Sequence, residues 1–270
     1  MSRAWTYWVA QLVTALVVLF LISPVVVTVL ASLTTTDYVI FPPQGITLRW
    51  YMEVLNHPEF IESFVLSLGV AMTTAAVATV LGTLAALALV RYRFTGRDLL
   101  QAFFLSPLML PSVVLGVGLL QFYSRLGLAA SPGALVLGHL VITVPYVIRL
   151  VSASLAGFDR NLERAAANLG ATPLQVLGKV TLPIIKSGIL AGLAFAFVVS
   201  FDDLTIALFV VSTDVVTLPV RIFSYLQYAY DPLITSVSTL LILFAIAVMV
   251  SLERILGIGH LIRSQRPRGA

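Results

Sequence analysis

The sequence predicts an all-α membrane protein with six transmembrane helices and both termini in the cytoplasm. Three observations carry this prediction. The chain has 270 residues, of which 59% are hydrophobic and only 10% charged. Its mean hydropathy of +1.03 is higher than soluble domains of this size show. It contains apolar runs long enough to cross a bilayer. Its basic residues gather on one predicted side of those runs.

The apolar runs are separated by polar or proline-rich intervals. They lie at about residues 8–33, 61–90, 99–123, 134–156, 184–211 and 233–256. All are far longer than the roughly 10 residues of a transmembrane β-strand, which favours helices. The first run also exceeds the apolar core of a signal peptide, about 7–15 residues, so it is predicted to remain as a helix.

Residues 34–60 are predicted to form an outer loop, because they are polar, include Pro42 and Pro43, and contain no run of spanning length. The stretch that begins Leu48, Arg49, Trp50, Tyr51 favours a short helix at the outer membrane interface. A plain surface loop is the alternative.

The distribution of positive charge predicts the orientation of the chain. Thirteen of the sixteen Lys and Arg residues lie on the side that carries both termini and residues 157–183, and only Arg49, Arg125 and Arg221 lie on the other. Because cytoplasmic loops carry the excess of positive charge, both termini and residues 157–183 are predicted to be cytoplasmic. The net charge of +4 fits this topology rather than nucleic-acid binding. Residues 1–270 are expected to form a single transmembrane domain.

Small residues and prolines indicate how the helices pack. Closely packed helix faces are predicted at Gly69, Thr73, Ala76 and Gly82 in the second run and at Gly188, Gly192, Ala196 and Ser200 in the fifth. The third run is interrupted by Pro107 and Pro111. Breaks of this kind are tolerated where the freed backbone is buried or faces a cavity, so the third run is predicted to line a path through the membrane.

The fifth run carries two adjacent acids, Asp202 and Asp203. A carboxylate in the membrane costs on the order of 3 kcal/mol, so such groups usually face a cavity or a partner. Sixteen residues beyond Lys186 correspond to roughly 24 Å of helix, which places the pair in the outer half of the bilayer. Adjacent helical residues point about 100° apart, so one acid is expected to face the path. The alternatives are an ion pair with a neighbouring subunit or a cap on a broken helix.

No pattern for catalysis or for a bound cofactor is present. The chain lacks cysteine and a Walker-type phosphate loop, and its histidines, His57, His139 and His260, lie in different segments. His139 is therefore predicted to be a hydrogen-bonded packing residue rather than a ligand. Neither an enzymatic activity nor a metal site is expected.

The long polar interval on the basic side predicts a helix-glycine-helix elbow. Residues 162–169 are rich in Ala and Leu, which are strong helix formers. Gly170 is suited to the left-handed conformation that ends a helix. Thr172 is placed to cap a second helix, with Pro173 at its first position and Gln175 completing a capping box. The elbow is interpreted as a docking element for a soluble partner; an ordinary amphipathic loop on the membrane surface is the alternative.

This elbow resembles the signature loop of ABC importer permeases, which reads Glu-Ala-Ala, three residues, Gly, nine residues, Ile, one residue, Leu-Pro. The matching residues are Ala165, Ala166, Gly170, Leu182 and Pro183, with Val180 at the Ile position. Arg164 occupies the position of the Glu, and Glu163 precedes it. In the family this loop is the coupling helix, which docks on the ATP-hydrolysing subunit. The resemblance implies that role for these residues and for Glu163 and Arg164.

Two further stretches resemble the subfamily that transports spermidine, putrescine, opines and related compounds. They are Ser200-Phe201-Asp202-Asp203 and residues 217–223. In polyamine permeases the acid pair is thought to receive the cationic substrate, and an acid often follows the proline of the third helix, where this chain has Ser112. The resemblance thus implies a substrate path at Asp202, Asp203, Ser200 and Ser112. An opine, an amino-acid derivative or an aminophosphonate remains open as the substrate.

The resemblance also implies an assembly in the bacterial inner membrane. It would comprise this permease of the type I, MetI-like architecture, a second homologous permease subunit, two ATPase subunits that bind MgATP, and an external substrate-binding protein. Two other classes remain: an ion-coupled secondary transporter with Asp202 or Asp203 as its proton site, and a structural membrane subunit without a path.

Overall fold

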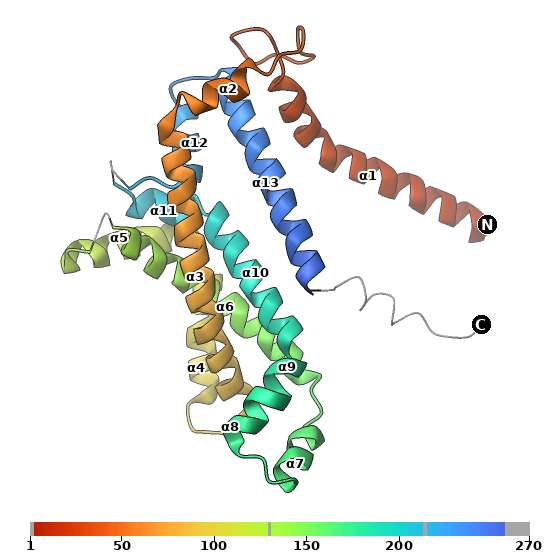
Figure 1. The fold of residues 1–270 in the computed structure, drawn as a ribbon, viewed down its shortest axis with the longest axis vertical. Coiled ribbons are helices and arrows are strands. Elements are labelled where there is room, and N and C mark those ends of the chain that lie inside the picture. The colour runs from red at the N-terminus through yellow and green to blue at the C-terminus, as the bar shows by residue number, and fades with distance from the viewer. Residues whose placement is uncertain (1–2, 129–130, 213–214, 257–270) are drawn as a thin grey trace. The chain divides into compact units, whose positions relative to one another are not determined.

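The structure is a computed structural model that describes residues 3–128, 131–212 and 215–256, and within these ranges it contains helices and no strands. The predicted cytoplasmic tail with His260, Arg263, Arg266 and Arg268 lies outside the described residues. The long helices are α1 (Arg3–Ala31), α3 (Pro58–Arg91), α6 (Pro132–Ala156), α10 (Lys186–Asp202) and α13 (Pro232–Leu256) (Figure 1). The all-α prediction is confirmed.

Shorter helices complete the chain. They are α2 (Arg49–Leu55), α4 (Arg97–Leu105), the 3-10 helix η1 (Ser106–Met109), α5 (Ser112–Leu126), α7 (Asn161–Asn168), α8 (Pro173–Val176), the π-helix η2 (Leu177–Thr181), α9 (Leu182–Ile184), α11 (Thr205–Val210) and α12 (Leu218–Leu226). Among them, α2 confirms the short helix expected after Leu48.

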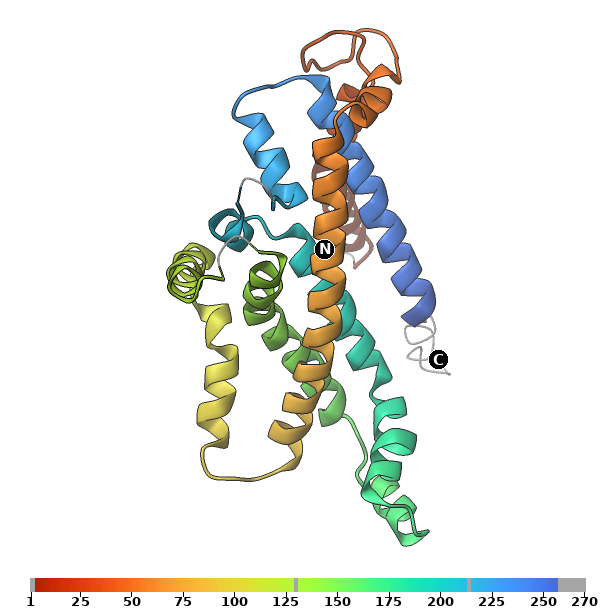
Figure 2. The ribbon, with the colours of Figure 1, turned by 60° about the vertical axis from the view of Figure 1, so that its left-hand side comes forward.

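Four helices of the described chain are long and apolar enough to cross a membrane: α1, α3, α6 and α13. Two further candidates are bent pairs, which bring the number of spans to six if each pair counts as one. The third predicted run bends by 106° between η1 and α5, at Leu110 and Pro111 (Figure 2), and the chain bends by 69° between α9 and α10. Pro111 has no N–H to donate and cannot continue the preceding helix, which accounts for the first bend.

The chain divides into two compact units, which we describe separately. The first comprises Met1–Glu62 and Arg221–Val250. In this unit, hydrogen bonds join residues 32–34, where the predicted outer loop begins, to α2. The Trp50 indole N–H donates to the Thr34 carbonyl at 3.0 Å, and the hydroxyls of Ser32 and Tyr51 lie 2.6 Å apart. By contrast, no residue of the most apolar stretch of α1 is buried within this chain, so its side chains are left to lipid or to another subunit.

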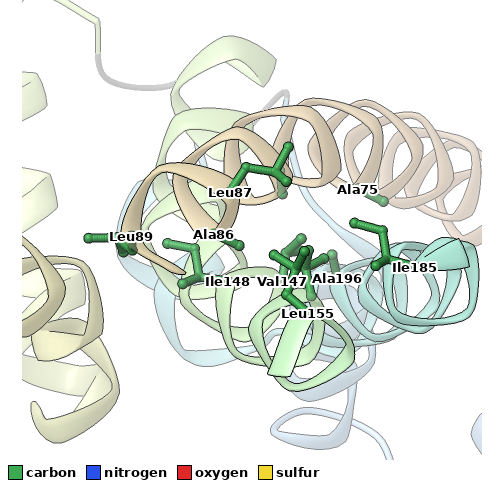
Figure 3. Close-up of a cluster of buried hydrophobic side chains, with 11 residues drawn as sticks. Ala75, Ala86, Leu87, Leu89, Val147, Ile148, Leu155, Ile185 and Ala196 are labelled. Carbon is green, nitrogen blue, oxygen red and sulfur yellow. The ribbon is translucent and has the colours of Figure 1, made fainter. Parts of the chain in front are cut away.

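The second unit, Ser63–Val220 with Ser251–Ala270, contains the main core. Side chains of α3, α6, α9 and α10 meet there, and Figure 3 shows Val147 and Leu155 of α6 facing Ala196. The four predicted small residues of the fifth run, Gly188 to Ser200, are all buried, which confirms that packing face. A Cβ added at Gly188 would lie 2.5 Å from Ser154 Cβ, so α10 approaches α6 too closely for a side chain there.

Of the four residues of the packing face predicted for the second run, one is buried within this chain. Gly69, Thr73 and Ala76 are exposed, and only Gly82 is buried. The buried stripe of α3 lies on another side of the helix and includes Ser67, Ala71, Thr74, Ala75 and Ala78. Both faces carry small residues, so spacing alone could not select between them.

Candidate functional site

The elbow forms as its sequence predicts. Helix α7 ends in a Schellman motif: Gly170 has φ +88°, its N–H donates to Ala167 O at 2.9 Å, and the Ala171 N–H donates to Ala166 O at 3.1 Å. Helix α8 then starts with the expected capping box, in which the Gln175 side chain accepts from Thr172 N at 2.9 Å and the Thr172 hydroxyl accepts from Gln175 N at 3.4 Å. Local sequence therefore fixes the turn between the two helices.

The turn presents apolar side chains to its surroundings. Leu169 is 89% exposed and Leu174 is 80% exposed, one on each side of Gly170. Neither leucine was predicted to be a contact residue, although apolar residues beside a polar docking turn are a usable signal. Arg164 and Ala165 are also exposed, whereas Ala166 is half-buried. Exposed leucines of this kind fit a surface that another protein covers.

The base of the elbow packs on the core. Leu182 is half-buried against the main cluster, and Pro183 is exposed at the start of α9. Glu163 turns inward: its carboxylate accepts hydrogen bonds from Arg91 of α3 and from the hydroxyl of Thr181. Glu163 and Arg164 are thus neighbours with different surroundings, one engaged within the chain and one exposed.

The acid pair lies at a break rather than inside a continuous helix. Helix α10 ends at Asp202, and Asp203 has extended backbone (φ −68°, ψ 117°). Asp203 Oδ2 accepts a hydrogen bond from Ala207 N at 2.9 Å, within α11. The expectation of one helix over 184–211 is therefore wrong, and the alternative of a cap on a broken helix holds for Asp203. Asp202 is exposed, whereas the Asp203 side chain is only 11% exposed.

Asp203 belongs to a buried polar cluster with His139 and Ser200. His139 is 1% exposed, its Nδ1 lies 2.8 Å from Ser200 Oγ, and its Nε2 lies 3.6 Å from Asp203 Oδ2. The prediction that His139 is a hydrogen-bonded packing residue is confirmed. Of the predicted path residues, the structure thus brings Ser200 and Asp203 together, with Asp202 beside them in sequence.

Ser112 is placed differently. It is the first residue of α5, directly after the bend at Pro111, and it is exposed. Within the described ranges no hydrogen bond joins its side chain to the acid pair. The same part of the chain holds no group of three or more His, Asp or Glu residues arranged to bind a metal ion.

Comparison with known proteins identifies the class. Residues 78–258 match the family of binding-protein-dependent transport system inner membrane components, and the chain belongs to this family. It is therefore the permease component of a bacterial ABC importer, a multi-pass inner-membrane subunit without catalytic function of its own. Membership implies an ATPase and an external binding protein as partners.

Curated relatives come from several transport systems. The chain is 36% identical to the putrescine transport system permease protein PotI of Escherichia coli, over 83% of this chain and 82% of that protein. It is 31% identical to the spermidine/putrescine permease PotC of Haemophilus influenzae, over 77% and 80%. It is also 30% identical to the trehalose permease SugB of Mycobacterium tuberculosis, over 83% and 82%.

Solved structures support the fold. A bacterial ABC transporter involved in alginate import aligns with a TM-score of 0.68 at 16% identity, over 99% of both chains. An inward-facing MetNI methionine transporter aligns with a TM-score of 0.63 at 18% identity, over 74% of this chain and 95% of that chain. The fold is that of a type I importer permease, as the sequence predicts.

Proposed function

We propose that this permease imports a polyamine, with putrescine or spermidine as the substrate class. The observation that carries the proposal is the exposed carboxylate of Asp202 at the end of α10, beside an Asp203 already engaged in capping α11. A polyamine carries ammonium groups, for which an unengaged carboxylate is the natural partner. Two relatives with polyamine names support the same class.

In this proposal the two acids have separate roles. Asp202 receives an ammonium group of the substrate, whereas Asp203 keeps the break between α10 and α11 in place with Ser200 and His139 behind it. Ser112 would lie further along the path, after the bend in the third span. Because one relative is a trehalose permease, a sugar is the competing substrate class for this chain. A neutral sugar would not need the charge of Asp202.

The energy for transport would come from two ATPase subunits that bind MgATP, while this chain binds no cofactor. The elbow, with Leu169, Arg164, Ala165 and Gly170 at its exposed side, would dock on one of them. A second homologous permease subunit would complete the path. Closure of the ATPase pair would carry the elbow and tilt the helices it joins, exchanging inward-open and outward-open states.

The test is uptake of radiolabelled putrescine into proteoliposomes that contain the whole transporter, with its binding protein outside and ATP inside. We expect Asp202→Asn to lower uptake about tenfold, which corresponds to the loss of roughly 1.4 kcal/mol from one charge-assisted contact. Glu62→Gln, a change at another exposed acid, is the control and should leave uptake unchanged. Uptake of radiolabelled trehalose without uptake of radiolabelled putrescine would overturn the polyamine assignment.

A further inference from the structure

The end of α3 nearest the elbow is attached to it by three polar side chains from three elements. Arg91 is the last residue of α3, Glu163 lies in the first turn of α7, and Thr181 is the last residue of η2. Arg91 Nη2 donates to Glu163 Oε1 and, at 3.0 Å, to Thr181 Oγ1. The Thr181 hydroxyl donates to the same carboxylate oxygen. One oxygen atom thus joins all three elements.

These three side chains are largely shielded from water, which strengthens the ion pair between Arg91 and Glu163. The side chain of Arg91 is 20% exposed, that of Glu163 is 19% exposed, and Thr181 is fully buried. Exposed ion pairs contribute little, but removing one partner of a shielded pair leaves the other charge uncompensated. The three residues, here called the α3 linkage, are therefore expected to stay together.

A second set of contacts holds the same place. The Arg91 guanidinium lies 5.9 Å from the centre of the Phe158 ring, within the usual range of a cation–π contact. Arg160 Nη2 donates to the Val90 carbonyl at 3.3 Å. Both partners come from the segment that leads from α6 into α7. The end of α3 is therefore held by the elbow on more than one side.

The covalent chain does not provide this connection. The elbow follows α6 and leads into α10, whereas α3 lies more than sixty residues before it in sequence. Without the α3 linkage, a displacement of the elbow would reach α6 and α10 directly and α3 only through side-chain packing. We propose that Arg91, Glu163 and Thr181 transmit elbow movement to α3, so that three spans move as one body. Glu163 is then a positioning residue inside the permease and not a contact to the ATPase.

This inference rests on the proposed docking of the elbow, but its first test does not need transport. The chain contains no cysteine, so Tyr92→Cys and Asn161→Cys, both at exposed positions, give this subunit two defined sites for spin labels; the other subunits are used as cysteine-free variants. In the assembled transporter we expect one narrow distance between the labels by EPR, the same with and without ATP. Glu163→Arg places a like charge opposite Arg91 and should broaden the distribution of distances between the labels. Adding Arg91→Glu to Glu163→Arg restores opposite charges and should narrow the distribution again.

The second test measures putrescine taken up per ATP hydrolysed. Glu163→Gln removes the charge with little change of shape, and we expect it to lower this ratio at least fivefold while ATP hydrolysis continues, within the 5–150-fold range of typical coupling energies. Glu163→Arg should also lower the uptake ratio, and adding Arg91→Glu to it should recover part of that lost uptake per ATP. Arg93→Ala, an exposed arginine two residues away, is the matched control and should leave the ratio unchanged.

The outcomes separate the two proposals. If Glu163→Arg leaves the EPR distance unchanged, or if Glu163→Gln leaves the uptake ratio at its wild-type value, the α3 linkage does not transmit movement. The same conclusion follows if adding Arg91→Glu to Glu163→Arg recovers nothing relative to the single variants. If the wild-type assembly shows no ATP-driven putrescine uptake, the proposed function fails, and the EPR distances still decide the linkage.

Discussion

Ser200 illustrates how one buried hydroxyl organises the break in the fifth span. It is 3% exposed and contacts His139, whose other ring nitrogen faces Asp203. Sequence spacing placed Ser200 correctly on the packing face of α10, but it could not reveal that His139, sixty-one residues away, is its partner. Long-range pairs of this kind depend on which helices pack together, which local patterns do not encode.

Removing that hydroxyl should destabilise the protein. Ser200→Ala leaves a buried imidazole nitrogen without its partner, so we expect a loss of about 1–3 kcal/mol in the free energy of unfolding. Ser112→Ala removes an exposed hydroxyl and is the control. Thermal unfolding of the purified transporter in one detergent measures both. Equal unfolding temperatures for the two variants would contradict the assigned role of Ser200.

Asp203 should behave as a cap and not as a substrate ligand. Its replacement by Ala removes the acceptor for Ala207 N, and we expect about 0.5–2 kcal/mol of lost stability. Asn preserves an acceptor oxygen, so Asp203→Asn should lose less stability than Asp203→Ala and keep most of the uptake. Uptake and unfolding measured on both variants check this, and an Asn variant that is stable yet inactive would return Asp203 to the substrate path.

At the scale of elements, the elbow was the most predictable part of the chain. Its stop and start signals, Gly170 and the box of Thr172 and Gln175, act within a few residues, so the sequence specifies them completely. The break after Asp202 was expected only as an alternative, because residues 203–211 are apolar enough to continue a span. The face at Gly69 is not the one that α3 buries within this chain, and spacing could not select between the two because both carry small residues.

Gly170 permits a direct test of the turn. At φ +88° a residue with a side chain is strained by roughly 1–2 kcal/mol, although among the described residues no atom beyond the immediate chain neighbours lies within 4 Å of the added Cβ. We expect Gly170→Ala to lower uptake per ATP hydrolysed, because the turn distorts while the helices persist. Gly178→Ala adds a methyl group with equally open surroundings in a helical conformation and is the control. Wild-type coupling in Gly170→Ala, or still more in Gly170→Trp, would contradict docking through this turn.

Two glycines of α3 should respond in opposite directions to the same substitution. A Cβ at Gly82 would lie 2.6 Å from Val147 Cβ, so Gly82→Ala overpacks the core, at a cost of about 1–3 kcal/mol. A Cβ at Gly69 meets nothing within 4 Å, and Ala is a better helix former by up to about 1 kcal/mol. Unfolding temperatures of the two variants should bracket that of the wild type. The reverse order would show that α3 packs differently.

For the whole molecule, membership of the permease family predicts that transport is driven by ATP hydrolysis in a partner subunit and not by an ion gradient. An ion-coupled carrier would work alone and stop with an uncoupler, whereas an ABC permease needs its ATPase. We expect purified chain in proteoliposomes to show no uptake by itself, and the full assembly to take up substrate in the presence of an uncoupler. Uptake by the chain alone would contradict the assignment. Composition and the elbow already indicated this class, but the substrate depends on a few side chains that no composition reveals.

Val147 has a consequence for the genetics of this permease. It sits against two glycines of different helices, with Cβ positions at Gly82 and Gly192 falling 2.6 Å and 3.1 Å from its side-chain atoms. The space at this crossing is shared, so enlargement on one side can be answered by trimming the valine. Selection for revertants of a defective Gly192→Ala strain should therefore return Val147→Ala, which removes the Cγ1 contact. Relief of Gly82→Ala should instead require Val147→Gly, because the Val147 Cβ itself lies in contact there.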